Sequence, residues 1–203
     1  MSEAQVPAVE RRSRAAPSLK GVERAKLLGE LAALHEGHSG EVAAFRRAAV
    51  DTALEDFRQM LEVNLLATFA LCCAAHPHLK ASRGSVVNVS SVTGSRVLPV
   101  RIAYGTSKAA LDHLTRSLAV EWGPDGIRVN AVLPWFTRTE MVLKVLEDRD
   151  FERKLIAATP LRRLAEPADV ARAVAFLALP DSDYISGQLL AVDGGYLPQA
   201  LSS

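Results

Sequence analysis

The sequence has few features of secreted, disulfide-stabilised or membrane-spanning proteins. Its 203 residues include only two cysteines, Cys72 and Cys73. Because adjacent helical positions point apart, a disulfide between them is disfavoured. No apolar run reaches the roughly 18–20 residues that span a bilayer, and the amino end lacks a secretory signal pattern. We therefore expect free thiols in a reducing cytoplasm and no membrane partner.

An excess of one charge and metal-binding patterns are also lacking. The 24 basic residues nearly balance the 23 acidic ones, so no bulk attraction to nucleic acid is expected. The five histidines fit no H-E-x-x-H or C-x-x-C pattern, and no metal is expected. Nucleophile elbows, P-loops and internal repeats are absent as well. The 49% apolar content suits a globular domain with a sizeable core.

A serine, a tyrosine and a lysine form the most informative pattern in the chain. Ser91 follows a strand-like run over 85–90, Tyr104 comes thirteen positions later, and Lys108 comes four positions after Tyr104. The apolar spacing over 102–122 predicts a helix, which places the phenol and the ammonium on one face. A nearby ammonium favours the phenolate, so it would lower the tyrosine pKa toward neutrality. The Ser91 hydroxyl could then hold a carbonyl oxygen beside the phenol.

A Y-x-x-x-K pair alone is more often a solvated helix face than a site. The placement of Ser91 at a strand end favours the functional interpretation, because ligands of doubly wound sheets bind outside the carboxyl ends of the strands. The further motifs of the chain are LEVNLLATF, GSVVNVSSVTG, AYGTSKAAL, GIRVNAVLPW and ISGQLLAVDGGY.

Together these ordered motifs resemble the short-chain dehydrogenase/reductase family over roughly residues 51–196. The resemblance implies an α/β fold, a Rossmann-like doubly wound parallel sheet in three αβα layers. The segment PWFTRT, with a tryptophan where most members have glycine, is most similar to the tropinone-reductase-like branch. The implied activity is that of an oxidoreductase that transfers hydride between NAD or NADP and a small-molecule carbonyl or secondary alcohol.

The resemblance also implies roles for individual residues. Tyr104 would be the acid–base, Lys108 would tune it and hold the cofactor ribose, and Ser91 would position the carbonyl oxygen. Asn64 would help to hold a relay water, although a helical asparagine can also simply bond to nearby backbone. The cofactor would contact Tyr104, Lys108, Pro134, Thr137 and Thr139. The long helices and the last strand imply a homo-oligomer, a dimer or a tetramer.

One part of the family pattern is missing from the sequence. Family members begin with a G-x-x-x-G-x-G turn whose following helix holds the cofactor pyrophosphate, and no such turn occurs before Asp51. We therefore expect an N-terminally truncated sheet with about three recognisable strands and an open edge at 85–90. This absence keeps a second hypothesis open: an inactive relative that cannot bind the cofactor, paired with a full-length homologue. On either hypothesis, we expect the chain alone to bind dinucleotide weakly or not at all.

The remaining segments complete the expected domain organisation. Residues 1–20 are predicted to be a disordered tail, with a basic nucleic-acid arm as the alternative, and residues 21–203 a single domain. Thr52 and Glu55 form a candidate capping box for a helix over 51–80. The other expected elements are a helix over 22–36, a strand over 126–134, helical lid segments over 140–165, a helix over 166–179, a strand over 188–192 and a turn over 193–195.

Overall fold

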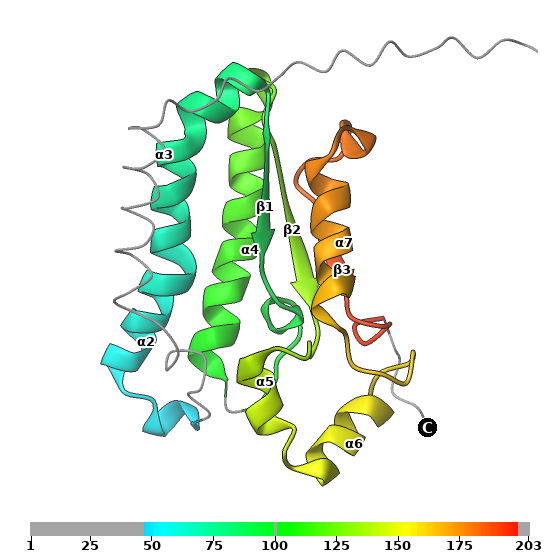
Figure 1. Cartoon of the computed structure of the whole chain (residues 1–203). Coiled ribbons are helices and arrows are strands. Elements are labelled where there is room, and N and C mark those ends of the chain that lie inside the picture. Colours follow the sequence, from blue (N-terminus) through cyan, green and yellow to red (C-terminus); the bar gives the residue numbers. More distant parts are fainter. Residues whose placement is uncertain (1–46, 100, 199–203) are drawn as a thin grey trace, which may run out of the picture.

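The computed structural model describes residues 47–99 and 101–198 (Figure 1). Within these residues, three parallel strands form one sheet in the order β1-β2-β3. They span Ser85–Val89 (β1), Arg128–Pro134 (β2) and Leu189–Val192 (β3). The predicted three-stranded parallel sheet is therefore confirmed, with boundaries within two residues of those expected. The turn predicted after β3 is also present, with Gly194 and Gly195 at positive φ.

Helices cover both faces of this sheet. Helix α4 (Ile102–Trp122) lies on one face, where Leu118 and Trp122 pack with Val129 of β2. Helix α7 (Pro167–Ala178) lies on the other, where its Ala178 carbonyl accepts a hydrogen bond from Ser85 of β1. Because successive residues of a strand point to opposite faces of the sheet, the same short strands can contact α4 on one face and α7 on the other. The result is the expected αβα arrangement, visible in Figure 1.

The predicted long helix over 51–80 differs from the observed one in two ways. It begins at Leu54, and Thr52 does not cap it: the Thr52 hydroxyl donates to the Ala48 carbonyl oxygen instead. It also contains a π-helical turn, Glu62–Leu66 (η3), between α2 (Leu54–Leu61) and α3 (Ala67–Ser82). By length and composition alone, the continuous segment Leu54–Ser82 could cross a membrane. The search for an unbroken apolar run did not predict this segment, and 11% of its most apolar window is buried.

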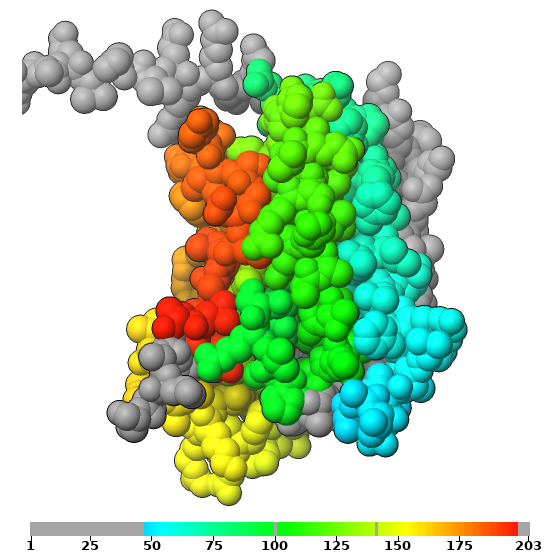
Figure 2. Space-filling model, turned by 180° about the vertical axis from the view of Figure 1, so that it is seen from behind, coloured from blue at the N-terminus to red at the C-terminus, as the bar shows by residue number. Residues whose placement is uncertain are grey.

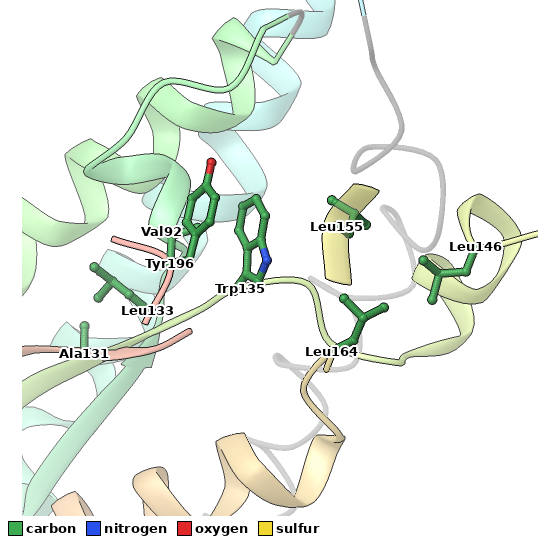
Figure 3. Packing of buried hydrophobic residues seen from close by; sticks show 8 residues of the cluster. All are labelled: Val92, Ala131, Leu133, Trp135, Leu146, Leu155, Leu164 and Tyr196. Carbon is green, nitrogen blue, oxygen red and sulfur yellow. The ribbon is translucent and has the colours of Figure 1, made fainter. Parts of the chain in front are cut away.

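Three hydrophobic clusters lie in the described part, and the smallest of them joins Met60 of α2 to Ala103 of α4. The other two are larger. One lies between the sheet and the helices α3 and α4, and includes Cys72 and Ile127. The other lies under the carboxyl ends of the strands (Figure 3), where the rings of Trp135 and Tyr196 stack at 3.6 Å between centroids. Both thiols are free: Cys72 is buried and Cys73 is exposed. The second cluster positions the segment that follows β2.

The segment after β2 is helical, as predicted for a lid. Helices α5 (Glu140–Val145) and α6 (Arg149–Ala157) follow β2 and precede α7. Pro167 is the first residue of α7, where its missing N–H leaves no extra unpaired donor, and Glu166 and Asp169 form a capping box. The predicted tail over 1–20, its boundary with the domain, and the helix over 22–36 lie outside the described residues.

Candidate active site

A pocket of about 700 Å³ opens at the carboxyl ends of β1 and β2. Its walls come from the η4 turn (Val92–Gly94) after β1, the first turns of α4, the segment after β2, and α5 and α7. Every residue that the sequence singled out for the site lines this pocket: Asn64, Ser91, Tyr104, Lys108, Pro134, Thr137 and Thr139. The fold therefore brings together side chains that are up to 75 positions apart, Asn64 and Thr139.

Ser91 and Tyr104 both line the pocket, and their side chains share a hydrogen bond. Ser91 caps the η4 turn, because its Oγ accepts a hydrogen bond from the Thr93 amide at 3.2 Å. Tyr104 lies in the first turn of α4. Burial raises the pKa of Tyr104, whereas its hydrogen bond with Ser91 and the charge of Arg101 lower it. The hydroxyl pair expected from the sequence is thus formed.

Lys108 lies one turn after Tyr104, but its ammonium does not bond to the phenol. Its Nζ is 5.7 Å from the centre of the Tyr104 ring and donates to the Val89 carbonyl oxygen at 3.0 Å. Burial lowers the pKa of Lys108 to about 8, against the opposing effect of Asp112. The expectation that Lys108 brings the tyrosine pKa toward neutrality is therefore wrong for this structure, because burial dominates at both groups.

Asn64 occupies the π-helical turn η3, at the side of the pocket. Its Nδ2 donates to the Ser107 hydroxyl at 3.0 Å, and its backbone carbonyl accepts from Thr68. π-turns inside α-helices are rare and frequent at functional sites. The asparagine therefore ties η3 to α4 through its side chain, a contact that neither of the two sequence interpretations anticipated.

The segment after β2 carries the remaining predicted contacts. Thr137 is buried, and its hydroxyl donates to the Trp135 carbonyl oxygen at 3.1 Å. The Trp135 indole points into the cluster of Figure 3, where Nε1 donates to Thr159 at 3.1 Å. The tryptophan that stands at the usual glycine position thus anchors the segment to the core between α6 and Tyr196.

Sequence reasoning missed two charged residues of this region. Arg101 precedes α4 and lines the pocket, and Asp112 is buried one turn after Lys108. Spacing could have found Asp112, because it lies four positions after Lys108 on the same face of the predicted helix, whereas Arg101 lies just before that helix. The π-turn left no clear sequence signal.

Comparisons with known proteins agree with this geometry. A family model described as Enoyl-(Acyl carrier protein) reductase matches residues 35–197. The chain belongs to the short-chain dehydrogenase/reductase family. A tropinone reductase homologue of Arabidopsis thaliana is 44% identical over 158 residues, which cover 77% of this chain and 60% of that protein. The chain thus spans about three fifths of that relative's length, and its similarity to tropinone reductase homologues confirms the predicted branch.

Solved structures of this family have the same fold. ElxO with NADP bound is 36% identical, with a TM-score of 0.71, over 75% of this chain and 62% of that one. Gluconate 5-dehydrogenase from Burkholderia cenocepacia, in complex with NADP and tartrate, is 28% identical, with a TM-score of 0.73, over 76% and 61%. The Rossmann-like fold expected from the sequence is therefore confirmed.

Proposed function

We propose that this short-chain dehydrogenase/reductase chain carries the catalytic part of an NAD(P)-dependent oxidoreductase that interconverts a small-molecule ketone and a secondary alcohol. The observation that carries the proposal is the convergence of Ser91, Tyr104 and Lys108 in one pocket at the carboxyl ends of parallel strands. Open α/β sheets bind their ligands at this edge, and the three groups are those that carbonyl reduction needs.

The chemistry follows from what each group can donate. In ketone reduction, the Ser91 and Tyr104 hydroxyls both donate to the carbonyl oxygen, and the phenol then gives up its proton to the forming alkoxide. Because burial holds the phenol neutral, it is in the correct protonation state to act as this acid. In the reverse direction the phenolate accepts the alcohol proton, and that anion is favoured by the hydrogen bond with Ser91 and by the charge of Arg101.

The described residues fit one end of a nicotinamide cofactor. The pocket has room for a nicotinamide ring beside the segment from Pro134 to Thr139, and Lys108 offers donors to a ribose hydroxyl. When bound, the cofactor supplies or accepts the hydride. The sequence has no G-x-x-x-G-x-G turn for the pyrophosphate. Binding by this chain alone is therefore expected to be weak, and the choice between NAD and NADP stays open.

The pocket lining favours a substrate with an apolar body. Its wall between η4 and α7 is built from apolar side chains: Val92, Leu98, Val142, Val145, Val170 and Ala171. Among the described lining residues there is no carboxylate, and the cations are Arg101 and Lys108. A neutral or anionic ketone with an aliphatic skeleton therefore fits better than a cationic one.

We also propose that the protein acts in the cytoplasm as a homo-oligomer. The side of the α2–α3 helix exposes Leu54, Leu66 and Phe69, each at least 46% exposed. In Figure 2 this helix and α4 form one continuous surface. A second copy packed against it would remove this apolar area from water. Light scattering at micromolar concentration tests the proposal, and a strictly monomeric chain contradicts it.

The test of the enzymatic proposal combines binding and turnover. NADH and NADPH are titrated by fluorescence, and hydride transfer to a panel of aliphatic ketones is followed by absorbance at a saturating cofactor concentration. We expect Tyr104→Phe to lower kcat by about 10²–10⁴-fold and to leave cofactor affinity within a few-fold. The matched control is Tyr184→Phe, because Tyr184 is fully exposed. Absence of saturable binding of either dinucleotide would instead support the inactive-relative hypothesis.

A further inference from the structure

A buried carboxylate lies directly behind the proposed catalytic residues. Asp112 is one helical turn after Lys108 on α4 and is only 4% exposed. Its Oδ2 would lie 2.5 Å from a Cβ added at Gly94, so the carboxylate rests directly on the backbone of the η4 turn. Only glycine leaves room for this contact. Since η4 begins immediately after Ser91, Asp112 touches the turn that presents the serine hydroxyl.

The Asp112 carboxylate also reaches the end of β1 through Ser90. The Ser90 hydroxyl has one proton and two possible acceptors. These are the Asp112 carboxylate and the Lys108 carbonyl oxygen, which lies at 3.3 Å. Ser90 is itself buried. Asp112 is thereby placed between the strand end, the η4 turn and the lysine helix turn, and it contacts neither the pocket nor a ligand position.

The burial of this charge is not offset by a close ion pair. Among the described residues, no cation lies within 4 Å of Asp112, and its Oδ1 accepts no hydrogen bond from a protein group. Burial raises the pKa of its carboxyl, and the Ser90 hydroxyl, Arg116 and Lys108 lower it. A buried carboxylate with incomplete hydrogen bonding costs stability, so its presence here calls for a role.

Lys108 lies one helical turn before Asp112, and the charge of Asp112 affects its ammonium. Burial lowers the pKa of the lysine to about 8, and Asp112 raises it. The other groups around the ammonium are the Tyr104 phenol on its own helix and the Val89 carbonyl of β1, with Asn64 and Arg101 elsewhere on the same pocket wall. Among these described groups, Asp112 is the carboxylate whose charge raises the pKa of Lys108.

We propose that Asp112 is a positioning residue: it holds the turn that presents Ser91, through Gly94 and Ser90, and its negative charge acts on the Lys108 ammonium one helical turn away. Its catalytic consequence rests on the function proposed above, whereas its effect on Lys108 does not. Asp112 acts from behind the pocket, through two groups that face the substrate.

The test measures Lys108 directly and needs no cofactor. The rate of Lys108 acetylation by dilute acetic anhydride is followed by mass spectrometry between pH 6 and 10, in the whole chain and in Asp112→Asn. We expect the midpoint to fall by about half a pH unit or more in the variant, because a neutral amide no longer favours the ammonium. The matched control is Glu121→Gln, which removes an exposed acid from the same helix and should leave the midpoint unchanged.

Two further results decide the proposal. Asp112→Ser provides a second neutral variant, and near-ultraviolet circular dichroism checks the fold of each. An unchanged Lys108 midpoint in a folded neutral variant overturns the proposal. Unfolding of both variants also overturns it, since Asp112 would then be needed for the fold alone.

If the chain proves unable to bind dinucleotide, the acetylation result still stands, so failure of the enzymatic proposal and failure of this one remain distinguishable. In an active chain, Asp112→Asn should lower kcat more than it changes KM.

Discussion

The two strands that border the pocket are held in different ways. The β2 strand pairs on both sides, and its residues from Val129 to Leu133 are at most 2% exposed. Within the described residues, β1 pairs only with β2, and Val89 at its carboxyl end is 52% exposed. Yet both strands deliver functional residues to the same pocket. Because β1 has one neighbouring strand in the described part where β2 has two, contacts outside the sheet matter more for its position.

Helix α4 supplies such contacts. Asn88 of β1 donates to the Thr115 hydroxyl at 2.9 Å, the Lys108 ammonium donates to the Val89 carbonyl at 3.0 Å, and Ser90 reaches the helix backbone. Three successive residues at the end of β1 are thus tied to one helix. The difference between the strands teaches that the pocket end of β1 depends on polar contacts with α4, and the pocket end of β2 on apolar packing.

The largest expected difference is between two valines that are register partners, Val132 of β2 and Val89 of β1. Val132→Ala should lower the free energy of unfolding by about 2–3 kcal/mol, because it removes two methyl groups from a site with no solvent exposure. Val89→Ala should change it by no more than about 0.5 kcal/mol, as at an exposed position. Urea unfolding of both variants measures the difference.

Equal losses at the two valines would break the comparison. They would mean that Val89 is covered in solution, by a partner or by a segment outside the described residues. Repeating the unfolding at several protein concentrations separates these cases, because only a partner makes the effect depend on concentration.

The next effect is at the polar connection between β1 and α4. Thr115→Val keeps the shape of the side chain but leaves the buried Asn88 amide without its acceptor. The loss should be about 1.5 kcal/mol, as for an unpaired buried polar group. Ser117→Ala on the exposed side of the same helix is the control and should cost less than about 0.5 kcal/mol. A Thr115→Val variant as stable as the wild type would show that α4 does not fix the edge strand.

The sequence predicted the elements around the site better than the details that tune it. The strand ends, the helix that carries Tyr104 and Lys108, and the pocket lining follow from periodicity and ordered motifs, because apolar spacing fixes which face of an element is buried. The three parallel strands and their order along the chain were anticipated in the same way. The seven predicted site residues depended on more than periodicity: spacing singled out Ser91, Tyr104 and Lys108, and the resemblance to the family implied Asn64, Pro134, Thr137 and Thr139.

The unpredicted features depend on tertiary contacts. The helix start at Leu54 instead of Asp51, the π-turn around Asn64 and the direction of the tyrosine pKa each result from packing that the local sequence does not specify. Charge spacing suggested a lysine that lowers the pKa of its neighbour. In the structure the pKa of Tyr104 is raised instead, because burial disfavours the phenolate. The Lys108 ammonium does not offset this, since it donates to the Val89 carbonyl oxygen.

A third expected effect tests the same reversal through pH. The Lys108 pKa is about 8 in the folded chain and about 10.4 in an unfolded one. Between these values the unfolded chain binds more protons, so the stability of the wild type rises with pH, and below pH 8 the full cost of burying the charge is present. The Lys108→Met variant has no charge to bury at this position, so its stability lacks this pH dependence. The wild type should therefore gain stability relative to Lys108→Met between pH 7.5 and 9.5, whereas its difference from Thr106→Val, at an exposed position of α4, should stay constant. Urea midpoints at the two pH values measure both differences. If the gap between the wild type and Lys108→Met stayed the same, the lysine would be solvated, and the edge strand would lose one of its three polar connections to the helix.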